Sequence, residues 1–296
     1  MDDNWDVDTQ LVFNTYEDIA SRPNFKTEID TSTSTIYKLI AVYSFPNKQH
    51  CGKKGCHQPH NNGWLAVTTD GQETLIGSKC GLEWGGDKFS LEKTQLNRRV
   101  KRDTQLKAYY QILQDADLIL DKVNEIKTRS KGADWLAKTI KKLEDACTFE
   151  LMRMIRLRAS RGETTITIET LKTKEERDIE AVSKTGGVVS PYKVEIIGSL
   201  VGLELFKYDL REVLMIEIYK KLQDMRLLNP TTLPTPTLNS LVKDAGAFRL
   251  LFKQSEDILS YADRFFSTTN NFKLIKMLDK ENKHNHLTTI KWFENQ

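Results

Sequence analysis

The stretch Cys51-Gly-Lys-Lys-Gly-Cys56-His57-Gln-Pro-His60 and the later stretch Gly77-Ser-Lys-Cys80-Gly81 decide the fold around them. They gather three of the four cysteines of the chain, and together with His50 they hold three of its five histidines. Structural zinc sites take four tetrahedral ligands from thiolates and imidazoles, and the first two ligands are separated by a few residues. Glycines beside the cysteines permit the tight turns that such a site needs. The pattern therefore predicts a zinc ion that holds a small module together.

Three cysteines leave one position of a tetrahedral shell to be filled, and His50, His57 and His60 are the candidates. The spacing Cys56-x3-His60 lets the chain curl back to the metal, whereas His57 adjoins Cys56 and would project differently. The predicted ligands are Cys51, Cys56, His60 and Cys80, with His57 as the alternative ligand. The competing interpretation of the cluster is a set of unrelated thiols on a loop, beside histidines that face water.

Short β-prone runs surround the predicted ligands. A run at 36–45 leads toward the first cysteine and is expected to stop at Pro46. Two further runs, 64–67 and 74–76, flank the Asp-Gly pair at 70–71, which is typical of a tight hairpin turn. The zinc site is therefore expected to be built on a β-hairpin.

The order of a cysteine turn, a hairpin and a glycine-flanked cysteine leading toward a helix resembles the treble-clef class of zinc fingers. The resemblance covers about residues 48–90. The sequence departs from the usual pattern because Glu83 stands three residues after Cys80, where a second cysteine would be expected. The fourth ligand must then come from another part of the module.

The predicted zinc is structural, because catalytic zinc keeps one position open for water and this shell is filled by protein. The His-Glu-x-x-His motif and the His-x-Glu…Pro-Cys-x-x-Cys motif of nucleobase deaminases are both missing from the sequence. So are a Walker-type phosphate loop, a Gly-x-Ser-x-Gly elbow and a dinucleotide fingerprint. The sequence favours a binding protein over an enzyme.

The charges of the chain are sorted along its length, although the net charge is only +3. Residues 93–161 carry seventeen Lys and Arg against nine Asp and Glu, whereas residues 162–296 carry equal numbers of both signs. A basic segment next to a zinc module is suited to contacting phosphates, and the Gly52–Gly55 loop offers two further lysines. The predicted nucleic-acid contacts are Lys53, Lys54, Arg98, Arg99, Lys101, Arg102 and Lys107. The alternative is that these cations are simply solvated on the protein surface.

The rest of the chain has mainly helical patterns. Apolar residues recur at helical spacing at Leu106, Tyr109, Leu113, Ala116, Leu120 and Val123. A break at 130–132 and a second stripe at 136–154, closed by Arg161-Gly162, predict an antiparallel helical hairpin. Cys147 falls on the apolar side of the second helix and is predicted to be a small core residue.

The following region predicts a small β element and more helices. Residues 164–169 and 188–197 are strand-like, and Thr173-x-x-Glu176 matches a capping box that would begin a short helix between them. A long helix is predicted over 203–225. The predicted fold is α+β and predominantly α-helical. Its parts are a polar lead-in (1–35), a zinc-binding β-hairpin module (36–90), a basic helix with an antiparallel helical hairpin (91–162), a small β element plus long helix (163–228), a Pro-rich linker (229–237) and a C-terminal helical region (238–296).

Cellular context follows from what the sequence lacks. The acidic start differs from a secretory signal, and no apolar run approaches the roughly 20 residues that cross a bilayer. Cysteines gathered near histidines favour metal in a reducing compartment, so a cytoplasmic protein with no membrane partner is expected.

Three functional hypotheses follow. The first is a zinc-stabilised, nucleic-acid-associated protein that binds DNA or RNA. The second is a scaffold whose long helices dock a protein partner or a second copy of the chain. The third is an effector that needs a partner chain to form an active site.

Overall fold

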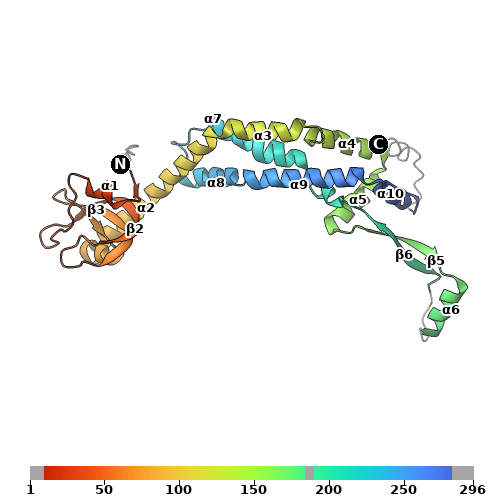
Figure 1. Ribbon diagram of the computed structural model, residues 1–296, viewed down its shortest axis with the longest axis horizontal. Helices are drawn as coiled ribbons and strands as arrows, with labels where there is room; N and C mark the ends of the chain where they lie inside the picture. Colours follow the sequence, from red (N-terminus) through yellow and green to blue (C-terminus); the bar gives the residue numbers. More distant parts are fainter. Residues whose placement is uncertain (1–9, 184–189, 282–296) are drawn as a thin grey trace. The chain divides into compact units, whose positions relative to one another are not determined.

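The computed structural model describes residues 10–183 and 190–281, and it confirms the α+β, predominantly helical fold class. The acidic start of the chain, Val188 and Val189 of the predicted second strand, and the His-Asn-His stretch at 284–286 lie outside these residues. The chain divides into two compact units, which are described separately. Unit 1 comprises Met1–Tyr110 and Pro230–Asn239, and unit 2 comprises Gln111–Asn229 and Ser240–Gln296. Figure 1 labels helices and strands of both units, among them β2, β3 and α2 of unit 1.

A four-stranded sheet in the order β1-β2-β3-β4 forms the centre of unit 1. The strands are β1 (Val12–Phe13), β2 (Ile36–His50), β3 (Pro59–Thr68) and β4 (Glu73–Ile76). β1 pairs parallel to β2, and the other pairs are antiparallel. The predicted hairpin is confirmed, with Gly71 in the turn at a φ of 83° that only glycine adopts readily.

Strand β2 continues beyond Pro46, where the sequence predicted its end. The ladder with β3 is irregular between Ser44 and Gln49, and Pro46 lies inside this interruption. Proline lacks the backbone N–H that a ladder needs, and a bulge tolerates it because the residues there are not paired. Pairing resumes at Gln49 and His50, directly before the first cysteine of the cluster.

Residues 10–35 are part of unit 1, which differs from the predicted polar lead-in. Leu11, Phe13, Ile19 and Ile29 are buried in its core. Helix α1 (Tyr16–Ala20) follows β1, and Arg22 donates two hydrogen bonds to the carboxylate of Glu73, at 2.5 and 2.9 Å. The unit therefore begins well before residue 36.

Helix α2 (Ser78–Gln114) begins two residues before Cys80 and is kinked at Gly86, which has a φ of 52°. The kink lets the first part of α2 carry Cys80 while the second part packs Phe89 and Leu96 into the core. Trp64 and Trp84 are half-buried in the same core. The ring of Trp64 contacts Phe89 edge-on.

Unit 2 contains the turn of the predicted helical hairpin, with α3 (Ala116–Thr128) before it and α4 (Ala133–Ala146) after it. The apolar stripe of the first predicted helix is divided, because its residues up to Leu113 lie in α2 and those from Ala116 onward lie in α3. The second predicted helix is in fact two helices, because α4 ends at Cys147 and α5 (Phe149–Arg161) begins after Thr148. The Thr148 hydroxyl accepts the N–H of Leu151 and caps α5. Cys147 is thus a half-buried residue in extended conformation between two helices, and its prediction as a core residue within a helix was wrong.

The predicted small β element is confirmed as strands β5 (Thr165–Leu171) and β6 (Tyr192–Ser199), with α6 (Lys174–Ser183) between them. The capping box is confirmed as well. The Thr173 N–H donates to the Glu176 carboxylate at 2.8 Å, and the Glu176 N–H donates to the Thr173 hydroxyl at 3.3 Å.

The predicted long helix of residues 203–225 is divided into segments. These are the 3₁₀ turn η1 (Leu203–Lys207), the π-helical segment η2 (Glu212–Lys220) and α7 (Lys221–Leu227). Asp209 separates the first two, because its carboxylate accepts the N–H groups of Arg211 and Glu212 and caps the second segment.

Three helices complete the described chain: α8 (Thr235–Gly246), α9 (Phe248–Ser267) and α10 (Thr269–Glu281). The predicted linker at 229–237 is shorter than expected, because α8 begins at Thr235, with Pro236 in its first turn, where proline is tolerated. The apolar stripe of α9 buries Phe248, Leu259, Ala262 and Phe265, whereas Phe266 is half-buried.

Candidate metal centre

The structure brings three of the predicted metal ligands together. The sulfur atoms of Cys51, Cys56 and Cys80 all lie within 4.8 Å of one another, and the Cys56 and Cys80 sulfurs are 3.0 Å apart. Cys51 follows strand β2, Cys56 lies in the next turn, and Cys80 is in the first turn of α2. These three thiols could hold a metal ion.

The backbone holds the cysteine turn in place. The Cys51 N–H donates to the Gln58 carbonyl at 3.1 Å, and the Cys56 N–H donates to the Lys53 carbonyl at 3.0 Å. Gly52 lies against Thr74 of β4 so closely that a Cβ atom there would be 1.7 Å from the threonine hydroxyl oxygen. A glycine is required at this position, because any side chain would separate the turn from the sheet.

The electrostatics of the cluster favour a bound cation. Burial raises the pKa of the Cys51 thiol and raises that of Cys80 to about 12, whereas the hydrogen bond with Cys80 lowers the pKa of Cys56. Three neighbouring thiols cannot all ionise at neutral pH without a compensating positive charge. A divalent cation would provide that charge, and its binding would release protons from the thiols.

His60 lies beside the cluster, although its ring nitrogens are not within the 4.8 Å group of sulfurs. Its Nδ1 shares a hydrogen bond of 2.8 Å with the Tyr43 hydroxyl, and its Nε2 is buried with no hydrogen-bond partner among the described residues. The ring packs against Gly77, whose backbone N–H also hydrogen-bonds the thiol of Cys51. Burial lowers the pKa of His60, which favours the neutral imidazole that binds metals.

The other two histidines contact other groups. His57 is exposed, and its Nε2 lies 3.8 Å from the Glu28 carboxylate. The Nδ1 of His50 hydrogen-bonds the backbone carbonyl of His57 at 2.9 Å. His60 is therefore the histidine whose burial and free nitrogen fit a ligand role best.

Three of the predicted nucleic-acid contacts form ion pairs within unit 1. Lys53 contacts Glu83 at 3.1 Å, and Lys54 contacts Asp30 at 2.9 Å. Lys107 contacts Asp103, one helical turn away, at 2.8 Å. These surface ion pairs are weak, so the lysines remain available to a stronger anionic partner.

Arg102 has a structural role that the sequence did not reveal. Its guanidinium donates to the carbonyls of Thr231 and Leu233 and to the hydroxyl of Thr235, at 2.7 to 3.2 Å. It thereby fixes the 230–239 segment within unit 1. Arg99 is half-buried, whereas Arg98 and Lys101 are exposed.

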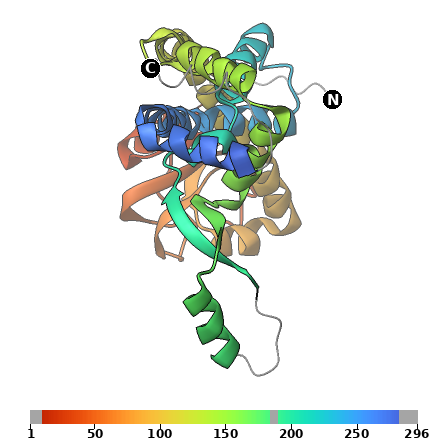
Figure 2. The same ribbon diagram turned by 90° about the vertical axis from the view of Figure 1, so that its right-hand side faces the viewer.

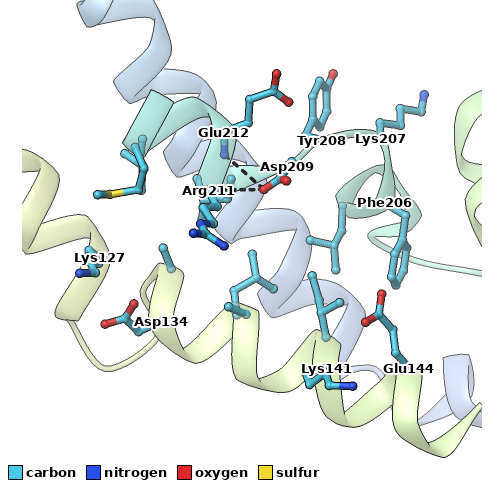
Figure 3. A pocket seen from close by; sticks show the side chains of 18 of the residues that line it. Lys127, Asp134, Lys141, Glu144, Phe206, Lys207, Tyr208, Asp209, Arg211 and Glu212 are labelled. Carbon is cyan, nitrogen blue, oxygen red and sulfur yellow. Dashed lines mark hydrogen bonds between the residues drawn. The ribbon is translucent and has the colours of Figure 1, made fainter. Parts of the chain in front are cut away.

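Unit 2 contains a groove of about 850 Å³ that the sequence did not predict (Figure 3). It lies between α4 and the segment from Leu205 to Met215, and its rim mixes cations such as Lys141 and Arg211 with acids such as Asp134. An ion pair joins Glu144 to Arg156 at the same groove. Because the rim carries both positively and negatively charged side chains, its charge favours neither anionic nor cationic ligands. We therefore assign no function to the groove.

None of the helices in the described part of the chain is both long enough and apolar enough to span a membrane. No family model, curated protein or solved structure matches this chain.

Proposed function

We propose that unit 1 is a zinc-stapled binding module in which the ion has a structural role. The observation that carries the proposal is the meeting of three cysteine sulfurs from two separate turns within 4.8 Å. Thiolate-rich tetrahedral sites select zinc among the common intracellular divalent ions. His60 supplies the fourth ligand through Nε2 after a small movement of its ring toward the sulfurs, and a shell filled by protein leaves no position for a reacting water.

Tyr43 positions His60 in this proposal. Its ring is buried and stacks beside the imidazole, with centroids 5.8 Å apart, and its hydroxyl hydrogen-bonds Nδ1. Histidine ligands usually donate their second ring N–H to such a partner, which fixes the tautomer and the ring orientation. Gly63 makes room for the hydroxyl, since a Cβ there would be 2.3 Å from it.

Replacing Tyr43 with phenylalanine is expected to weaken zinc binding by about 10- to 100-fold, because the imidazole loses the partner that orients it. Competition with a chromophoric chelator measures the affinity, and the absorption spectrum of the Co²⁺ form reports whether a nitrogen remains in the shell. Tyr37→Phe is the matched control, since Tyr37 lies on the same strand but is exposed. Equal affinities for the two variants would show that Tyr43 does not position the ligand.

We also propose that unit 1 binds single-stranded nucleic acid through the outer face of α2. Tyr37 is 59% exposed, and the Lys88 ammonium lies 5.3 Å from the centroid of its ring. Lys88, Leu91 and Arg98 follow one another at helical spacing and are all exposed. An exposed aromatic ring with the cations Lys88 and Arg98 on the same helix face is an arrangement on which bases can stack while phosphates are neutralised.

The double variant Arg98→Ala/Lys101→Ala tests this second proposal in a titration with labelled single-stranded DNA and RNA at two salt concentrations. We expect about tenfold weaker binding at low salt and a smaller salt dependence, because fewer counterions are released on binding. The control Lys138→Ala/Lys142→Ala removes the same charge from exposed positions of α4 in unit 2. If both double variants bind like the parent, or the parent does not bind at low salt, the proposal fails and the zinc proposal is unaffected.

A further inference from the structure

Strands β5 and β6 form a two-stranded ribbon that leads away from the helices of unit 2, with α6 at its far end (Figure 2). We call the ribbon and α6 the arm. The base of the arm is anchored, since Ile166 and Leu200 are buried and Gly198 packs against Leu274 of α10. Beyond the base, the two strands pair only with each other among the described residues.

One face of the ribbon is apolar and exposed. Residues that pair directly across antiparallel strands project to the same side. The pairs on this face are Thr167–Ile196, Glu169–Val194 and Leu171–Tyr192. Leu171 is 70% exposed, Val194 66% and Ile196 74%. A ribbon of two strands gains stability only when such a face is covered, so this face is expected to have a partner.

The arm does not cover this face with its own helix. Lys193, which projects to the opposite side, contacts Glu176 of α6 at 2.6 Å and Glu195 at 2.8 Å. A further ion pair joins Lys172 to Glu180 of α6. The helix is therefore held at the tip by ion pairs, and the apolar face stays open.

The charge of the face indicates what covers it. Glu169 lies in the middle, between the Leu171 and Thr167 positions, and makes no ion pair with any described residue. A partner that buried the face would have to supply a cation for this carboxylate, since an unpaired charge in an interface is costly. We infer that the arm docks a partner protein through an amphipathic helix that presents a Lys or Arg within its apolar face.

The same charge disfavours two other occupants. Two copies of the chain packed face to face would bring two Glu169 carboxylates into one interface, with no cation on that face to compensate them. An anionic membrane surface would repel Glu169, and the exposed side chains of α6 add no net positive charge to attract it, because Lys174 and Arg177 are balanced by Glu175 and Asp178. Measurements of dimerisation and of vesicle binding distinguish these two occupants from a partner protein.

Two synthetic amphipathic helices test the inference with the full chain. They are identical except that one carries Lys and the other Glu at the centre of the apolar face. We expect fluorescence anisotropy to show that the Lys peptide binds about tenfold more tightly than the Glu peptide, the range of a close interfacial charge pair. Glu169→Lys should reverse this preference, and Val194→Asp should abolish the binding of both peptides. The control Glu175→Lys changes an exposed acid of α6 and should leave the preference unchanged.

Several results would overturn the inference. These are an absence of binding, equal affinity for the two peptides, or a preference that Glu169→Lys does not reverse. Concentration-dependent dimerisation that Val194→Asp abolishes would assign the face to a second copy instead. Binding to anionic vesicles that Val194→Asp abolishes would assign it to a membrane. Circular dichroism of each variant establishes that the chain is still folded.

Discussion

Replacement of Cys80 by serine is expected to abolish binding of the proposed zinc ion and to unfold the sheet of unit 1. Cys80 joins α2 to the turn that contains Cys51 and Cys56, so its loss breaks the link between these two segments. The expected loss of zinc affinity exceeds about 100-fold, since even removing an outer-shell partner of a ligand costs about 10- to 100-fold. Metal binding and folding are coupled in small modules, so the sheet should lose its hydrogen-exchange protection together with the metal.

The control for this experiment is Cys147→Ser, which removes the cysteine that lies between α4 and α5 in unit 2. This variant should keep its zinc and the protection of strands β2 and β3. Elemental analysis of both purified variants measures the metal directly. One equivalent of zinc in the Cys80→Ser protein, or a parent protein without any stoichiometric metal, would contradict the proposed centre.

The second large effect is expected at Gly202, where alanine should destabilise unit 2 by about 2–5 kcal/mol. Gly202 has a φ of 73°, which disfavours any residue with a side chain. A Cβ atom would also lie 2.4 Å from the backbone carbonyl oxygen of Tyr261 and 2.7 Å from the backbone nitrogen of Phe265. These atoms belong to helix α9 and cannot move aside without disturbing the packing of the helix.

Gly246 provides the matched control, because its Cβ would project into open space, with no atom of another segment within 4 Å. It is the last residue of α8, and alanine there should change stability by less than about 1 kcal/mol. Urea unfolding and hydrogen exchange of the α9 amides compare the two variants. Similar stabilities would show that the close approach of Gly202 to α9 does not constrain the fold.

Local patterns in the sequence predicted most elements whose cause is local. The Asp-Gly pair at 70–71 predicted the hairpin, and Thr173 with Glu176 predicted the cap of α6, because each signal acts within a few residues. The three sulfurs were predicted from spacing alone, since glycine-flanked cysteines restrict how the chain can turn. The fourth ligand remains a proposal, because a buried nitrogen is recognisable only in three dimensions.

The sequence did not predict structure that depends on contacts between segments far apart in the chain. Residues 10–35 look polar in sequence, yet Ile19 and Ile29 are buried because β2 and the cysteine turn cover them. Helical periodicity in the sequence continues through Cys147 and Tyr208. In the structure the helix is interrupted at both positions, because Thr148 and Asp209 cap the helices that follow. Capping residues next to an apolar stripe were the signals that could have revealed these breaks.

The sequence by itself determined the class of fold, the cysteine cluster and the basic character of the α2 segment, because periodicity, ligand spacing and charge are properties of neighbouring residues. Only the tertiary structure decided the environment of each side chain. It directed Arg102 to the carbonyls of the 231–235 segment, placed Tyr43 against His60, and left the Val194 face of the arm open. The physical reason is that burial and hydrogen bonding depend on segments that meet only after the chain has folded.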